Sequence, residues 1–143
     1  MTSAAQRAHS LVLLCVANSA RSQMAEGLAR ASAPVGWSVF SAGSQPAIVH
    51  PLAIVVMEEI GIDITGHRSK GLDDVPLGEA DFVITLCADE VCPVVPGSVH
   101  RLHWPLPDPA SEGEMIRDQI EAFRKVRDEI KRRLTAFWAE HPE

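Results

Sequence analysis

A cysteine and an arginine near the start of the chain have the spacing of an oxyanion-binding nucleophile. Cys15 and Arg21 enclose five residues, and Ser22 follows the arginine. An apolar run, 11–14, precedes the cysteine, and a helical pattern, 23–31, follows the serine. In a loop between a strand and a helix, successive backbone N–H groups bind an anion, and the helix N-terminus adds partial positive charge. The same field favours the thiolate, which is the nucleophilic form of cysteine.

These residue types predict a thiolate that attacks a tetrahedral oxyanion. The residues expected to surround the anion are Val16, Ala17, Asn18, Ser19, Ala20, Arg21 and Ser22. Arginine grips such an anion with two parallel hydrogen bonds, and the serine hydroxyl donates to the thiolate. The alternative is that Cys15 is a small buried residue at a strand end, which is common for cysteine. The chain has no lysine-bearing Walker loop, so the loop is not built for a nucleoside triphosphate.

A second candidate group, Asp108, lies between two prolines in the stretch Pro107-Asp108-Pro109. As a general acid it would protonate the oxygen that leaves when the thiolate attacks. As a structural residue it would simply form a turn, since Asp-Pro is ordinary turn chemistry. The spacing alone leaves both interpretations open.

The other two cysteines, Cys87 and Cys92, form a third candidate group. A thiolate adduct on one cysteine can be attacked by a second thiol, and a third thiol can relieve the resulting disulfide by exchange. The structural alternative is one buried and one incidental cysteine. A zinc site that adds His100 and His103 is disfavoured, because the spacings match no common structural zinc pattern.

The elements that must position these residues alternate between strand and helix. Strands are predicted at 10–15, 37–42, 82–86 and 99–103, and helices at 22–32, 51–61 and from a Ser111/Glu114 capping box to about 138. This alternation predicts one α/β domain, residues 1–143, with a four-stranded parallel sheet and helices on both faces. Ligands in such folds lie beyond the carboxyl ends of the strands. We therefore expect Cys15 and Cys87 to face one crevice.

Composition narrows the function classes. The net charge of −6 argues against nucleic-acid binding, which needs a basic face. No apolar run approaches the roughly 20 residues of a membrane span, and the polar first residues, 1–9, resemble no secretory signal and are expected to be flexible. Three cysteines favour reactive or buried thiols over a disulfide framework. We expect a cytoplasmic monomer without a membrane or nucleic-acid partner.

Nearly the whole chain resembles the thioredoxin-coupled arsenate reductases, which share the low-molecular-weight tyrosine phosphatase fold. The main block of resemblance is Leu13–Ala29, LLCVANSARSQMAEGLA. The further matching segments are Phe40–Gly43, Met57–Ile64, Val83–Cys87, Cys92-Pro93, His103-Trp104, Asp108–Ala110 and Phe123–Ile130.

The resemblance implies reduction of arsenate to arsenite by a relay of three thiols. Cys15 would attack arsenate held by Arg21 and the loop amides, and Asp108 would protonate the leaving hydroxyl. Cys87 would then attack Cys15 and release arsenite. Cys92 would attack Cys87, and external thioredoxin would reduce the Cys87–Cys92 disulfide, so that no bound cofactor is required.

The sequence departs from the family pattern in two places. Four residues separate Cys87 and Cys92, where many members have six. Some members also bind potassium beside the loop through an Asn, a Glu, a Ser and an Asp. The first three match Asn18, Glu26 and Ser41, but Lys70 stands where the Asp would be. An ammonium group there would repel a cation and replace it against the glutamate, so we predict no metal site. The alternative is that Lys70 is an exposed loop lysine.

The residues alone leave two competing functions open. A low-molecular-weight protein tyrosine phosphatase would use the same Cys15, Arg21 and Asp108. Such phosphatases usually carry tyrosines after the Asp-Pro, whereas Ala110 and Ser111 follow here and the chain has no tyrosine. Weak phosphatase side activity is still expected. A non-enzymatic arsenic or redox sensor would use the three thiols but would leave Arg21 and Asp108 unexplained.

Overall fold

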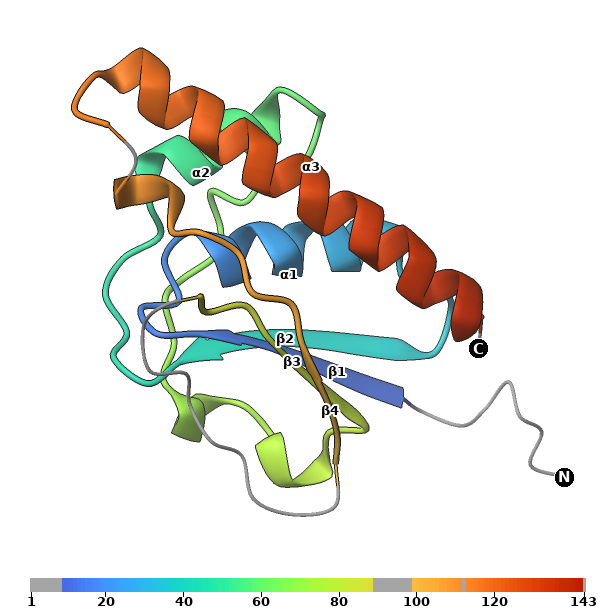
Figure 1. The fold of residues 1–143 in the computed structure, drawn as a ribbon. Coiled ribbons are helices and arrows are strands. Elements are labelled where there is room, and N and C mark those ends of the chain that lie inside the picture. Colours follow the sequence, from blue (N-terminus) through green and yellow to red (C-terminus); the bar gives the residue numbers. More distant parts are fainter. Residues whose placement is uncertain (1–8, 89–98, 112, 143) are drawn as a thin grey trace, which may run out of the picture.

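One four-stranded parallel sheet organises the chain (Figure 1), whose computed structural model describes residues 9–88, 99–111 and 113–142. The strand order is β2-β1-β3-β4. The strands are β1 (His9–Cys15), β2 (Trp37–Gly43), β3 (Phe82–Thr85) and β4 (His100–His103). The helices are α1 (Arg21–Ser32), α2 (Pro51–Glu58) and α3 (Ile116–Glu140). The predicted α/β fold is confirmed, and the element boundaries agree with the prediction to within a few residues except at the start of α3.

The central strand β1 is apolar on both sides because both faces of the sheet are covered. Leu11 and Leu13 belong to the core beneath the three α-helices, whereas Val12 and Leu14 pack on the opposite face. Figure 1 shows α1, α2 and α3 on one face of the sheet. The opposite face is covered by two short 3₁₀ helices, η2 (Leu72–Asp74) and η3 (Leu77–Glu79). Helices thus lie on both faces as predicted, but those on the second face are single 3₁₀ turns.

The predicted start of the last helix is wrong. Helix α3 begins at Ile116, and its N-cap residue, Met115, supplies no side-chain hydrogen bond. Ser111 instead ends the short 3₁₀ helix η4 (Pro109–Ser111), where its hydroxyl donates to the Asp108 carbonyl at 2.9 Å. Gly113, with φ of 73°, lies between the two helices in a conformation that glycine adopts readily. The serine hydroxyl is used in the turn and is not a helix cap.

Two arginines hold α3 against α2. Arg124 donates to the Glu59 carboxylate through Nε and Nη2, and Arg127 donates to the same carboxylate and to the Val56 carbonyl. Hydrogen bonding from Arg124, supported by Arg127, lowers the pKa of Glu59 to about 2. Phe123 is fully buried in the same interface.

Among the residues that the structure describes, none of the helices has the length and apolar character of a membrane span.

The strand ends bring the candidate residues to one edge of the sheet. Cys15 is paired in register with Gly43 at the ends of β1 and β2, and Cys87 follows β3. A Cβ atom on Gly43 would lie 2.3 Å from the Val16 carbonyl oxygen and 2.8 Å from the Asn18 nitrogen. Only a residue without a side chain allows the loop after Cys15 to pack this closely on β2.

We predict that Gly43→Ala destabilises the protein by about 1–3 kcal/mol, as overpacking does, and displaces the anion-binding loop. Gly78→Ala is the matched control, because nothing lies within 4 Å of the added Cβ. Urea unfolding and oxyanion binding of the two variants test this. Equal stability and equal anion affinity for the two variants would contradict it.

Candidate active site

The candidate nucleophile, Cys15, lies at the end of β1 with 2% of its surface exposed and carries a free thiol. The next residues lead into α1, whose N-terminus has no side-chain cap. An uncapped helix start in a tight loop is the usual environment for a bound anion. The structure therefore places the thiol where the sequence predicts it, under the loop formed by residues 16–22.

Three carbonyl groups of this loop accept hydrogen bonds from the segment before α2. The bonds run from Gln45 N to Val16 O at 2.8 Å, from Ala47 N to Ala17 O at 3.2 Å and from His50 N to Ser19 O at 2.9 Å. Ser69 Oγ also donates to Ala17 O. Because these carbonyls already have donors, the loop can present its N–H groups to an anion.

Asn18 is the hub of the loop, with φ of 48° and no exposed surface. Its Nδ2 donates to the hydroxyls of Ser22 (2.8 Å) and Ser41 (2.9 Å). Its Oδ1 accepts from Gln23 Nε2 (2.9 Å) and from the Lys70 backbone N–H (2.7 Å). Both donors and both acceptor positions are filled, so the amide orientation is fixed.

The Asn18 contacts set the direction of the bond to the nucleophile. Ser22 Oγ lies 2.8 Å from Cys15 Sγ. Because Ser22 accepts from Asn18, its own proton is available to the sulfur. A hydroxyl that donates to sulfur stabilises the thiolate over the thiol. The role of Ser22 as a donor to the thiolate stays a prediction, which this geometry supports.

Arg21 joins three parts of the candidate site. It is 5% exposed, and its Nη1 donates to the carbonyls of Leu106 at 2.9 Å and Leu86 at 3.4 Å. Leu86 directly precedes Cys87, and Leu106 lies two residues before Asp108. The guanidinium thus connects the anion-binding loop with the end of β3 and with the segment that carries the candidate acid.

Asp108 is half-buried at the start of η4, and its Oδ1 accepts from the Ala110 N–H at 3.0 Å. The turn interpretation is therefore correct for one carboxylate oxygen, and the role of Asp108 as an acid stays a prediction. Cys87 is fully buried and disulfide-bonded, whereas Cys15 is not part of a disulfide. Cys92 lies outside the described residues.

Comparisons with known proteins agree with this geometry. The sequence model of the low molecular weight phosphotyrosine protein phosphatases matches residues 10–141. An arsenate reductase of Halalkalibacterium halodurans is 43% identical over 129 residues, which cover 89% of this chain and 93% of that protein. The chain belongs to this phosphatase family, among its arsenate reductases.

Solved structures place the fold in the same group. An arsenate reductase in the phosphate-binding state superposes with a TM-score of 0.78 at 35% identity, covering 92% of this chain and 98% of that chain. A thioredoxin-dependent arsenate reductase of Corynebacterium glutamicum superposes with a TM-score of 0.72 at 32% identity, covering 94% of this chain and 62% of that chain.

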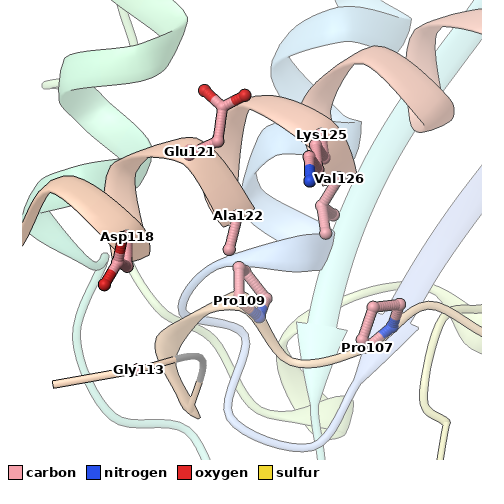
Figure 2. Close-up of a pocket in the computed structure, with 8 residues that line it drawn as sticks. All are labelled: Pro107, Pro109, Gly113, Asp118, Glu121, Ala122, Lys125 and Val126. Carbon is pink, nitrogen blue, oxygen red and sulfur yellow. The ribbon is translucent and has the colours of Figure 1, made fainter. Parts of the chain in front are cut away.

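A groove of about 460 Å³ lies beside the segment that carries Asp108 (Figure 2). Pro107 and Pro109 form one wall, and α3 forms the other with Ala122 and Val126 among its side chains. None of its lining residues belongs to the loop after Cys15. The groove is thus a neighbour of the candidate active site and not the oxyanion site itself.

A buried ion pair between Lys70 and Glu26 supports the anion-binding loop through Ser41. Glu26 is 4% exposed and accepts from Ser41 Oγ at 2.5 Å, while Lys70 Nζ lies 3.3 Å from the same carboxylate oxygen. Arg30 pairs with the other oxygen at 2.9 Å. Burial raises the pKa of Glu26, but the Ser41 hydrogen bond and the nearby charges, led by Lys70, outweigh it and leave the pKa below its ordinary value.

The predicted contact between Lys70 and Glu26 is confirmed, and the interpretation of Lys70 as an exposed loop lysine is wrong. The ammonium faces the glutamate carboxylate at 3.3 Å, and the absence of a potassium site stays a prediction. Among the described residues, no group of three or more His, Cys, Asp or Glu side chains is arranged to hold a metal. A chain of contacts runs from Lys70 through Glu26, Ser41 and Asn18 toward the nucleophile.

Sequence reasoning missed several residues of this support. Gln23 holds the Asn18 amide and the Arg68 carbonyl, and His67 lies 2.9 Å from Gln23 Oε1. Ser69 and His50 hold carbonyls of the loop. Only Gln23 lies next to the cysteine motif in the sequence. The other contacts join residues that are distant in sequence, so they can be found only in the three-dimensional structure.

We predict that Lys70→Ala lowers the free energy of unfolding by about 2 kcal/mol, because the buried Glu26 carboxylate loses one of its partners. The loss should be present at neutral pH and should shrink as the pH falls below the ordinary glutamate value. Glu26 has a lowered pKa in the folded state, so its stabilising contribution exists above that value and disappears on acidification. Denaturant unfolding between pH 3 and 7 measures this.

We also predict that the residue at position 70 decides whether potassium stabilises the protein. The wild-type chain should have the same melting temperature in potassium chloride and sodium chloride at equal concentration. Lys70→Asp is the matched variant, since it replaces the ammonium by a carboxylate and should gain stability specifically in potassium. A potassium-specific gain in the wild type would show that Lys70 does not exclude the ion.

Proposed function

We propose that the protein reduces arsenate to arsenite through Cys15, Cys87 and Cys92, with thioredoxin as the external reductant. The observation that carries the proposal is the position of Arg21. Its guanidinium belongs to the oxyanion loop and contacts the backbone beside both Cys87 and Asp108. One cation therefore joins a nucleophile, a second thiol position and an acid. The names of the similar proteins support arsenate as the substrate.

The first chemical step forms a bond between sulfur and arsenic. The Cys15 thiolate attacks arsenate held by Arg21 and the loop N–H groups, and an arsenic–oxygen bond breaks. Asp108 gives its proton to the departing oxygen, which leaves as water. Ser22 stabilises the thiolate before attack through the 2.8 Å contact.

The second step moves two electrons to arsenic. The Cys87 thiolate attacks the Cys15 sulfur, the sulfur–arsenic bond breaks and its electron pair stays on arsenic, which changes from the +5 to the +3 state. Cys92 then displaces Cys15 from Cys87, leaving a Cys87–Cys92 disulfide. A disulfide at Cys87 together with a free thiol at Cys15 is the combination that this final state requires.

A dithiol protein must return the disulfide to two thiols before the next cycle. The thioredoxin-dependent relative from Corynebacterium glutamicum supports thioredoxin in this role. Catalytic thiols persist in a reducing compartment, so a cytoplasmic location is part of the proposal. The sequence offers no reason for a partner beyond arsenate and thioredoxin, and we propose a monomer.

The proposal predicts that arsenite forms from arsenate in the presence of thioredoxin, thioredoxin reductase and NADPH. Cys15→Ser, Cys87→Ser and Cys92→Ser should each abolish repeated turnover, because each removes one thiol of the relay. If Cys92→Ser kept full repeated turnover with thioredoxin, the three-thiol relay would be wrong. Glutaredoxin with glutathione would then be the reductant to test.

A second activity separates the function of the anion-binding loop from that of the three-thiol relay. The family includes phosphotyrosine phosphatases, and phosphate has the shape and charge of arsenate. We expect weak hydrolysis of para-nitrophenyl phosphate that is retained in Cys87→Ser and lost in Cys15→Ser. Loss in both variants would mean that Cys87 supports the loop structurally, not only as a redox thiol.

A further inference from the structure

Gln23, the second residue after Arg21, is a fully buried polar side chain with no part in the proposed chemistry. Its Nε2 donates to Asn18 Oδ1 at 2.9 Å and to the Asn18 backbone carbonyl at 3.2 Å. The same nitrogen donates to the Arg68 carbonyl at 2.9 Å, and Oε1 lies 2.9 Å from His67 Nδ1. Both ends of this amide are therefore held by the residues around it.

The acceptors around Nε2 determine which way the Gln23 amide faces. If the amide were turned over, Oε1 would face Asn18 Oδ1 and two carbonyl oxygens, and acceptors would meet acceptors without a proton between them. The NH₂ group must therefore point toward Asn18, and Oε1 must accept from His67. A neutral imidazole has only one N–H group, so His67 carries its proton on Nδ1.

The Gln23 amide in turn restricts the Asn18 amide. Asn18 Oδ1 accepts from Gln23 and from the Lys70 backbone N–H, which leaves Nδ2 to donate to the hydroxyls of Ser22 and Ser41. If the Asn18 amide were turned over, its oxygen would face Ser22 and accept the hydroxyl proton. The sulfur of the nucleophile, 2.8 Å from the same hydroxyl, would then lose that donor.

We propose that Gln23 is a positioning residue for the nucleophile. Its amide holds the Asn18 side chain in the orientation that leaves the Ser22 proton for the Cys15 sulfur. The proposal rests on the proposed role of Cys15 as the nucleophile of arsenate reduction. Because the reactivity of Cys15 can be measured without arsenate, the two proposals can fail separately.

The charged groups beside these amides are not altered by a neutral substitution at Gln23. Those that act on the His67 ring are Glu26, Lys70, Arg30 and Asp63. Burial lowers the pKa of His67, and the Glu26 carboxylate only partly offsets this, so the ring is neutral at pH 7.5. In the proposed mechanism, Arg21 and Asp108 are the charged groups that face Cys15. Ser41 supports the same orientation of Asn18, because its own proton goes to Glu26.

We predict that Gln23→Met shifts the pH midpoint of Cys15 alkylation upward by about 0.5–1 pH unit, because the thiolate loses part of its hydrogen bond from Ser22. Methionine is uncharged and close to glutamine in shape, but it cannot donate to Asn18. The rate of alkylation by iodoacetamide between pH 5 and 9, followed at Cys15 by peptide mapping of the fully reduced protein, measures this midpoint. Gln119→Met is the matched control, since the Gln119 amide donates to the Gly113 carbonyl instead, and its midpoint should equal that of the wild type.

A double-mutant cycle with Ser22→Ala separates positioning from a general loss of loop structure. Once the Ser22 hydroxyl is absent, adding Gln23→Met should shift the midpoint of Cys15 alkylation no further, because the proton that Gln23 positions is gone. A shift of the same size with and without Ser22 would mean that Gln23 acts through the shape of the loop, and it would overturn the proposal. An unchanged midpoint in Gln23→Met alone would overturn it as well.

NMR of the wild-type protein tests the orientation of both amides without any variant. At pH 7.5, His67 should carry its proton on Nδ1, and the side-chain amide protons of Asn18 should show NOEs to Ser22 and Ser41. The Nε2–H tautomer of His67 would mean that the Gln23 amide is turned over. That result, or Asn18 amide protons that face the Lys70 backbone N–H, would overturn the proposal whether or not the protein reduces arsenate.

Discussion

The candidate active site depends on one buried amide, that of Asn18. A residue with positive φ inside a tight loop is costly unless its surroundings hold it. Four hydrogen bonds supply this restraint, to Ser22, Ser41, Gln23 and the Lys70 backbone. The same bonds orient Ser22 toward Cys15. The shape of the loop and the hydrogen bond between Ser22 and Cys15 thus both depend on the Asn18 amide, so a change at this amide alters both.

The elements around this amide act on it through backbone contacts and charge. Gly43 of β2 lets the loop pack against the sheet, and the segment before α2 takes the loop carbonyls, so that the N–H groups remain for an anion. Next to the loop, Lys70 forms an ion pair with Glu26, which in turn accepts from Ser41. The His50 backbone N–H also holds the Ser19 carbonyl of the loop.

The sequence predicts correctly the features that depend on neighbouring residues or on runs of apolar residues. The apolar runs predicted the four strands, and the Cys15–Arg21 spacing predicted the loop with its thiol and guanidinium. Sequence reasoning failed at the start of α3, because the Ser111 hydroxyl bonds within its own turn, which a capping pattern does not reveal. It also missed Gln23, His50 and Ser69, whose partners are distant in sequence or belong to the backbone. Polar contacts of this kind leave no periodic signal.

A single-turnover experiment tests the central claim most directly. The fully reduced protein is mixed with excess arsenate in the absence of any reductant, and arsenite and cysteine states are measured together by chemical quench and peptide mapping. The account predicts one arsenite per protein, a Cys87–Cys92 disulfide and a Cys15 that still reacts with an alkylating reagent. No arsenite, or one arsenite with Cys15 held in the final disulfide, would contradict it.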